Sequence, residues 1–202
     1  DVYKRQGVSG ESLSLTGAGI LGAASAGTQT ITNNNTLAIA DGTGSASNYT
    51  LNGASINVTV IPKTLNVTLA REYDGTTTVA GALLTPTFDS LQGGETLAIS
   101  GTGSVANANV GSSKAVTLGT IALAAGSGNP SNYSLNSVLL DVTQRVINLD
   151  GIRAYDATTN VLSSDINTFG NIVSGETLTI SGTGSVATNS VEMNKAISLG
   201  TL

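Results

Sequence analysis

The chain has 202 residues, a formal net charge of −5, 10% charged and 3% aromatic side chains, and neither cysteine nor histidine. The acidic balance argues against nucleic acid or an anionic membrane as a partner, because both need basic patches. The missing cysteines exclude disulfides and Cys-ligated metals, and the missing histidines exclude Ser/His triads and most zinc sites. No run of about 18 apolar residues is present, so we expect no membrane span.

Residues 1–6, DVYKRQ, match nothing in the remainder of the chain. They resemble the translation of a sequencing adapter, and we exclude them from reasoning about the fold. In the first segment of interest, residues 7–62, the stretch Ser12–Thr16 alternates between polar and apolar positions, which predicts a half-exposed strand. Further along, Leu21–Ala26 could make one helical turn.

A glycine pattern follows this first predicted strand. Residues 17–22 read GAGILG, a formal G-x-G-x-x-G. A dinucleotide site with that pattern needs a buried parallel strand before it and a helix after it. Here the preceding strand alternates, and the equivalent glycines, Gly101 and Gly182, lead into Asn- and Ser-rich segments. We therefore interpret the pattern as a repeated turn and predict no cofactor.

Short strands and regular turns characterise residues 63–144. Leu65–Leu69 and Thr96–Ser100 alternate strictly between apolar and polar positions, as strands with one buried face do. Further apolar runs predict strands at residues 115–118, 121–123, 133–135 and 138–142. Turn signals fall about every ten residues, a rhythm typical of a small antiparallel sandwich or barrel.

The sequence also repeats itself. Residues 94–105, GETLAISGTGSV, recur 81 positions later as GETLTISGTGSV with eleven of twelve positions identical, and SNYTLN recurs 84 positions later as SNYSLN. The repeat unit is about 82 residues long. We assign residues 63–144 as a complete repeat, 7–62 as the later part of a preceding one, and 145–202 as the first part of a following one, truncated before its N-Y-x-L strand.

The predicted fold class is all-β, with tandem small antiparallel domains. An immunoglobulin-like sandwich and a β-grasp-like sheet with a short helix both fit strands this short, and periodicity does not separate them. The linkers between repeats are short and are not rich in glycine and serine, which predicts a stiff array.

Acidic and aromatic side chains recur at equivalent repeat positions. Asp74 and Asp156 occupy equivalent turns in two repeats. Such an aspartate either binds calcium or a sugar, or it hydrogen-bonds the backbone of its own turn. No D-x-D-x-D run is present, so we favour the second interpretation. The recurring aromatic residues are predicted to be structural anchors: Tyr49 with Tyr133, Tyr73 with Tyr155, and Phe88 with Phe169.

The order of these motifs resembles a known repeat family. After a K-T-L strand come YDGTT at residues 73–77, then G-E-T-L, N-V-G-x-x-K-A-V and N-Y-x-L. This order resembles the YDG-type repeat domain of filamentous-haemagglutinin-like bacterial surface adhesins, and is similar to the related MBG repeats. The last copy departs from the pattern with Ala157 in place of the glycine, from which we infer that this position does not require a positive φ.

The resemblance implies secretion, display on the bacterial cell surface and a structural role, and it brings no catalytic residues. We therefore expect non-catalytic stalk or spacer repeats of an adhesin, which contact neighbouring repeats of the same chain. The alternative is an adhesive module that itself binds a host glycan, a host protein or calcium through exposed turns. A carboxylate-pair glycosidase is disfavoured, because the 13 acidic residues are spread over repeats too small for a deep cleft.

Overall fold

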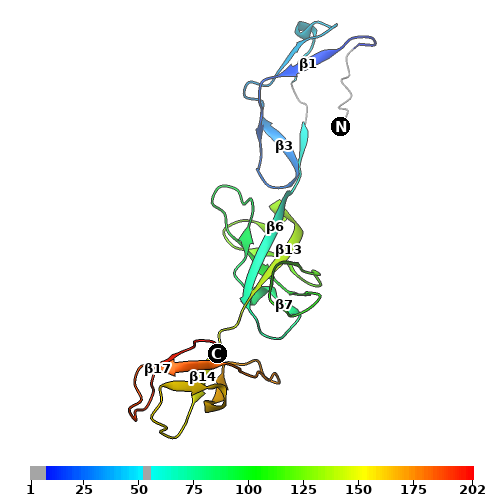
Figure 1. The fold of residues 1–202 in the computed structure, drawn as a ribbon. Helices are drawn as coiled ribbons and strands as arrows, with labels where there is room; N and C mark the ends of the chain where they lie inside the picture. The colour runs from blue at the N-terminus through cyan, green and yellow to red at the C-terminus, as the bar shows by residue number, and fades with distance from the viewer. Residues whose placement is uncertain (1–7, 52–55) are drawn as a thin grey trace.

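The computed structural model describes residues 8–51 and 56–202, so the adapter-like residues 1–6 lie outside the described residues. Three lobes follow one another along the chain (Figure 1). We call them the first unit (residues 8–60), the central unit (63–143) and the third unit (148–202). The regular elements of the described part are strands and single 3-10 turns, which confirms the all-β prediction.

The elements follow the chain from unit to unit. The first unit contains β1 Leu13–Thr16, β2 Ile20–Leu21, β3 Gly27–Asn33, β4 Ala38–Asp41, η1 Ala46–Asn48 and β5 Asn57–Val60. The central unit contains β6 Lys63–Glu72, β7 Thr78–Ala80, η2 Gly81–Leu83, β8 Thr87–Phe88, β9 Leu97–Ser100, β10 Thr102–Ser104, β11 Gly111–Ala115, β12 Ala122–Ala125, η3 Pro130–Asn132 and β13 Tyr133–Thr143. The third unit contains β14 Asn148–Gly151, β15 Asn160–Leu162, η4 Ser163–Asp165, β16 Ile166–Gly170, β17 Thr183–Val186 and β18 Ile197–Ser198.

Two long neighbouring strands organise the central unit. β6 and β13 run parallel in the middle of a four-stranded sheet of order β11-β13-β6-β8. The outer strands are antiparallel to their neighbours, and the antiparallel pairs β7–β10 and β9–β12 complete the unit. Both sheets of an immunoglobulin-like sandwich are antiparallel, so the mixed sheet differs from that alternative. Alternation identifies the buried face of a strand but not its neighbour, so it could not predict the parallel pair.

Strand β13 is one continuous strand, whereas the sequence predicted two. Its register against β6 shifts between Leu135 and Ser137, where β13 has an extra residue. Before this bulge Tyr133 is the buried side chain, and after it Val138 and Leu140 are buried, so the inward positions change from odd to even numbers. A bulge produces such a change of phase, and in the sequence it looked like a break between strands.

One smaller prediction was wrong and another was confirmed only in part. Leu21–Ala26 makes no helical turn, because Leu21 ends β2 and the chain then bends into β3 at Gly27. The strand predicted at residues 115–118 keeps Ala115, which ends β11, and beyond it a single bridge between Thr117 and Ser104.

The hydrophobic core lies almost entirely in the central unit. Leu65, Val67 and Leu69 of β6 and Val138 and Leu140 of β13 are at most 2% exposed. They belong to clusters with apolar side chains from the rest of the unit, which include Val79, Leu97, Ile99, Val105, Val116 and Ile121. Among the residues described in the third unit only Val161 and Ile166 are buried apolar side chains, and the first unit contributes none. Hydrophobic burial therefore stabilises the central unit far more than the other two.

The recurring glycine pattern forms a turn. Gly17, Gly101 and Gly182 have φ of 82°, 81° and 100°, which favours glycine. A Cβ at Gly101 would lie 2.0 Å from the Thr120 carbonyl oxygen, and the other two glycines face an equivalent carbonyl at 1.9 and 2.1 Å. The pattern at residues 17–22 leads into β2 and not into a helix. Positive φ and close backbone contact together account for the glycine.

The inference about Ala157 was wrong. Gly75 has a φ of 75°, and Ala157 at the equivalent position has a φ of 62°. The turn thus keeps its left-handed residue even where the side chain disfavours it. The reason is the neighbouring Asp, whose hydrogen bonds define the turn in both units, as described below.

Candidate functional site

The Y-D-G-T-T turn is built around an aspartate and an arginine. Asp74 Oδ1 accepts hydrogen bonds from Thr76 N at 2.9 Å and from Thr76 Oγ1 at 3.0 Å. Asp74 Oδ2 lies 3.0 Å from Arg71 Nη1. Arg71 also donates to the carbonyl oxygens of Thr76 and Thr78, at 2.5 and 2.6 Å. The arginine at the end of β6 therefore ties the turn to the start of β7.

The third unit repeats this geometry. Asp156 Oδ1 accepts from Thr158 N and Thr158 Oγ1, both at 2.9 Å, and Asp156 Oδ2 lies 3.1 Å from Arg153 Nη1. The hydrogen bonds from Thr158 and, after them, the Arg153 guanidinium lower the pKa of Asp156. Both carboxylate oxygens have partners within their own turn, which favours the turn-stabilising interpretation over a calcium ligand. Within residues 8–51 and 56–202, no group of three or more acidic side chains is arranged to hold a metal ion.

A tyrosine and a glutamate from distant parts of the repeat meet in two units. The Tyr133 hydroxyl donates to Glu95 Oε2, and the Tyr49 hydroxyl donates to Glu11 Oε2. Each hydroxyl also accepts a backbone N–H from the turn before its glutamate. The Glu95 carboxylate raises the pKa of Tyr133, because it stabilises the protonated phenol. This contact accounts for the glutamate that follows a glycine in the first and central copies, whereas the third copy's Glu176 accepts from the hydroxyl of Tyr73 instead.

The predicted aromatic anchors divide into two groups. Three of them contact the core of the central unit: Tyr73, Phe88 and Tyr133. The other three lie in the outer units: Tyr49 and Phe169 are half-buried, and Tyr155 is 64% exposed. Tyr155 therefore anchors no core among the described residues, although it occupies the repeat position of Tyr73.

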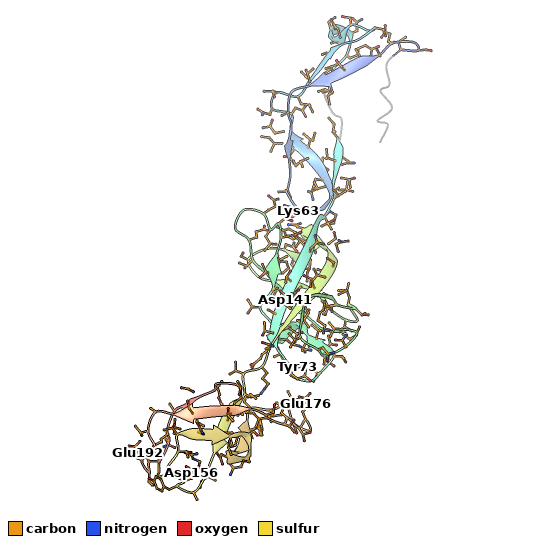
Figure 2. All side chains as sticks on the ribbon, in the orientation of Figure 1. Lys63, Tyr73, Asp141, Asp156, Glu176 and Glu192 are labelled. Atoms are coloured by element: carbon orange, nitrogen blue, oxygen red, sulfur yellow. The ribbon has the colours of Figure 1, made fainter. Side chains whose placement is uncertain are left out.

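Polar contacts join the central and third units. Arg145 donates from Nε to the Asn171 carbonyl and from Nη2 to Asn171 Oδ1, both at 2.7 Å, and from Nη1 to the Tyr73 carbonyl at 3.3 Å. Figure 2 shows Tyr73 and Glu176 at this junction, where the Tyr73 hydroxyl donates to Glu176 Oε1. These side chains come from both units, so they orient one unit relative to the other.

The junction role of Arg145 was not predicted from the sequence. A signal was present, because Lys63 occupies the same repeat position directly after the other linker. Next to Arg145, Val146 N donates to Glu72 Oε1 at 3.1 Å, which adds a contact to the end of β6. At the first junction, Ala26 N donates to Asn132 Oδ1 at 2.9 Å.

The third unit contains an open groove of ≈ 440 Å³. Its apolar lining includes Leu149, Ile152, Val161, Ile166, Val186 and Ile197. In the repeat, Leu149 corresponds to Val67 and Val161 to Val79, which belong to the central core together with side chains of β13. Several positions of the lining are thus core positions in the central unit, whereas Ile152 corresponds to the exposed Ala70.

Comparison with known protein families finds a YDG domain at residues 61–139. No curated protein and no solved structure matches the chain. The described residues include no helix that is long and apolar enough to cross a membrane. The matched range begins just before β6 and ends within β13, so it covers nearly the whole central unit. The chain therefore contains a YDG domain, and the aspartate–arginine turn described above lies within it.

Proposed function

We propose that the chain is a non-catalytic spacer, made of tandem repeats of a secreted bacterial surface adhesin, that holds a binding region away from the cell. The observation that carries the proposal is the arrangement of the units one after another, with side-chain contacts at both junctions (Figure 1). A spacer needs linkers that limit the relative motion of its units, and these contacts support that feature.

The use of charged side chains supports the same proposal. Lys114 Nζ donates to Asn107 O at 2.8 Å and to Asn107 Oδ1 at 2.9 Å, and it also contacts the Asn109 carbonyl. Lys195 makes the equivalent contacts to Thr188 and Ser190. Together with Arg71 and Arg153, these cations fix loops of their own unit. Groups engaged in this way support structure and are poorly placed to act on a substrate.

Small-angle X-ray scattering of the 202-residue chain tests the proposal. A compact domain of this length would have a radius of gyration of about 17 Å. The spacer proposal requires a clearly larger value and a distance distribution with a long tail. A radius of gyration near the compact value would contradict it. The measurement is made at low protein concentration so that association between chains does not lengthen the particle.

A matched pair of variants tests the contribution of the junction. Arg145→Ala removes three hydrogen bonds between the linker and its neighbours, so we expect a broader distribution of distances with the fold of the units intact. Arg153→Ala removes an arginine of the same type within the third unit and should leave the distance between units unchanged. Equal scattering profiles for both variants would mean that Arg145 does not stiffen the array.

A further inference from the structure

The chain enters and leaves the central unit through two neighbouring strands. β6 begins at Lys63, directly after the linker from the first unit, and β13 ends at Thr143, directly before the linker to the third unit. The two strands are parallel, so both begin at the same end of the unit, where Lys63 lies opposite Tyr133. The first and third units lie at opposite ends of the central unit (Figure 1). Tension along the chain therefore pulls the beginning of β6 one way and the end of β13 the other way, along the strand axes.

We infer that the β6–β13 pair has a load-bearing function: it is a mechanical clamp that keeps the central unit folded under tension. Each of the 10 residues of β6 lies opposite a residue of β13. The hydrogen bonds of a parallel pair are evenly spaced along the strands, so a pull along the strand axes loads them together. A pull across the strands from one end would break them one after another. Since β6 and β13 are the two inner strands, their separation would split the sheet into β11-β13 and β6-β8.

Buried side chains oppose sliding from one face of the pair. Leu65 and Leu69 of β6 and Leu140 of β13 are 0% exposed and pack in the core of the unit. A slip of one strand past the other by one residue would change which side chains face this core. Sliding is therefore opposed by the burial of apolar area as well as by the hydrogen bonds.

A side-chain contact holds the register at the bulge of β13. Asn66 Oδ1 accepts hydrogen bonds from Asn136 Nδ2 at 2.9 Å and from Ser137 Oγ at 2.8 Å. On the side of β8, Asn66 Nδ2 donates to Asp89 Oδ2 at 2.7 Å, and Asn66 N donates to Asp89 Oδ1 at 3.1 Å. Asn66 is thus held from both neighbours of β6, and a slip of β13 along β6 would separate it from the bulge.

Further contacts hold the end at which tension reaches β13. Tyr73 N donates to the Thr143 carbonyl oxygen at 2.9 Å, and Thr143 Oγ1 donates to the Arg71 carbonyl oxygen at 3.3 Å. Beyond the strand, Val146 N donates to Glu72 Oε1 at 3.1 Å. These bonds join the departing chain to the end of β6, which opposes fraying of the last pairs.

Pulling the same unit in two directions tests the clamp. The chain contains no cysteine, so introduced pairs of thiols define where the handles of an optical-tweezers experiment attach. In the full chain, Ile61→Cys with Gln144→Cys loads the strands along their axes. Ile61→Cys with Ser131→Cys loads them from one end, because Ser131 lies just before β13. All three positions are exposed.

The two double variants are pulled at the same loading rate, and urea unfolding establishes that both are folded. The unit should unfold at a several-fold higher force between residues 61 and 144 than between residues 61 and 131. Forced unfolding depends on the unfolding rate and not on the equilibrium stability, so the comparison isolates the direction of the load. Equal forces in the two directions, or a lower force between residues 61 and 144, would overturn the proposal.

A second measurement tests the contact at the bulge. Asn66→Ala should lower the unfolding force between residues 61 and 144. It should have a smaller effect between residues 61 and 131, where the first pairs to break precede Asn66. Asn107→Ala is the matched control, because the Asn107 side chain accepts from Lys114 Nζ and Asn109 N, outside the β6–β13 pair. A loss of force equal to that of Asn107→Ala, or equal in both directions, would overturn the role assigned to Asn66.

The clamp is independent of the proposed spacer role, because scattering measures the shape of the chain without load. An extended array that shows no dependence on pulling direction would remove the clamp alone. The comparison of pulling directions leaves every residue of β6 and β13 unchanged, so it decides the question even if Asn66→Ala does not fold.

Discussion

The central and third units contain nearly the same motif in different structures. The residues GETLAIS in the central unit include strand β9, and Leu97 is 7% exposed. In the third unit the corresponding GETLTIS forms no strand, and Leu178 is 46% exposed. β9 is paired with β12, and among the described residues of the third unit no strand occupies the place of β12. Strand formation here depends on a partner strand more than on local sequence.

In the first unit the strand equivalent to β9 is paired with a neighbour, but its apolar side chain is not buried. Its β1 is paired with β4 as β9 is paired with β12, so the strand is present. Nevertheless Leu15 is 54% exposed, whereas Ile99 at the same repeat position is 3% exposed. The difference is the opposing sheet: in the central unit β6 and β13 cover this face, and the described first unit has no such pair. The three copies therefore show that a partner strand produces the strand and a second layer produces the core.

The largest expected effect tests this comparison at one repeat position. Ile99→Ala removes a core side chain and should lower the free energy of unfolding of the central unit by about 2–5 kcal/mol. Leu15→Ala at the equivalent, half-exposed position should change stability by less than about 0.5 kcal/mol. Hydrogen exchange during urea unfolding reports each unit separately. Similar losses for the two variants would show that the first unit has a core comparable to that of the central unit.

A second prediction concerns the glycine turn. Gly101→Ala combines an unfavourable φ with a Cβ 2.0 Å from the Thr120 carbonyl oxygen, so it should destabilise the central unit by more than about 2 kcal/mol. Gly93→Ala is the matched control, because Gly93 has a φ of 56° but nothing within 4 Å of a Cβ. It should cost about 1 kcal/mol. Chemical unfolding monitored by circular dichroism distinguishes the two, and equal losses would mean that the close contact is unimportant.

Much of this architecture could be read from the sequence, and the exceptions share a cause. Alternation placed Leu65, Val67 and Leu69 on one buried face, and the repeat identified the Asp74 turn, because both depend on local spacing. The parallel partner of β6, the continuity of β13 through its bulge and the junction contacts of Arg145 depend on residues far apart in the chain. The groove of the third unit was not predicted as a site, although several positions of its lining repeat core positions of the central unit.

A smaller effect is expected at Ala157, where the third unit differs from the central unit in one turn residue. Ala157 has a φ of 62°, and glycine tolerates that conformation without steric cost. Ala157→Gly should therefore stabilise the third unit by about 0.5–1 kcal/mol after the greater flexibility of unfolded glycine is included. The reverse change in the central unit, Gly75→Ala, should destabilise it. Hydrogen exchange of residues near the turn measures both, and a loss of stability in Ala157→Gly would contradict the argument.

The smallest expected effect appears only at alkaline pH and concerns the tyrosine–glutamate contact. The hydrogen bond to Glu95 raises the pKa of Tyr133 above its usual value of 10.0. A folded-state pKa above the unfolded one means that the contact stabilises the central unit fully below the unfolded pKa and loses this contribution as pH rises through the folded pKa. Tyr133→Phe lacks the hydroxyl and keeps the ring in the core, so its stability relative to wild type should improve above pH 10.0. Urea unfolding of both proteins across that range measures the difference. A constant difference between them would show that Tyr133 does not titrate next to Glu95, and the recurring tyrosine would then act through its ring alone.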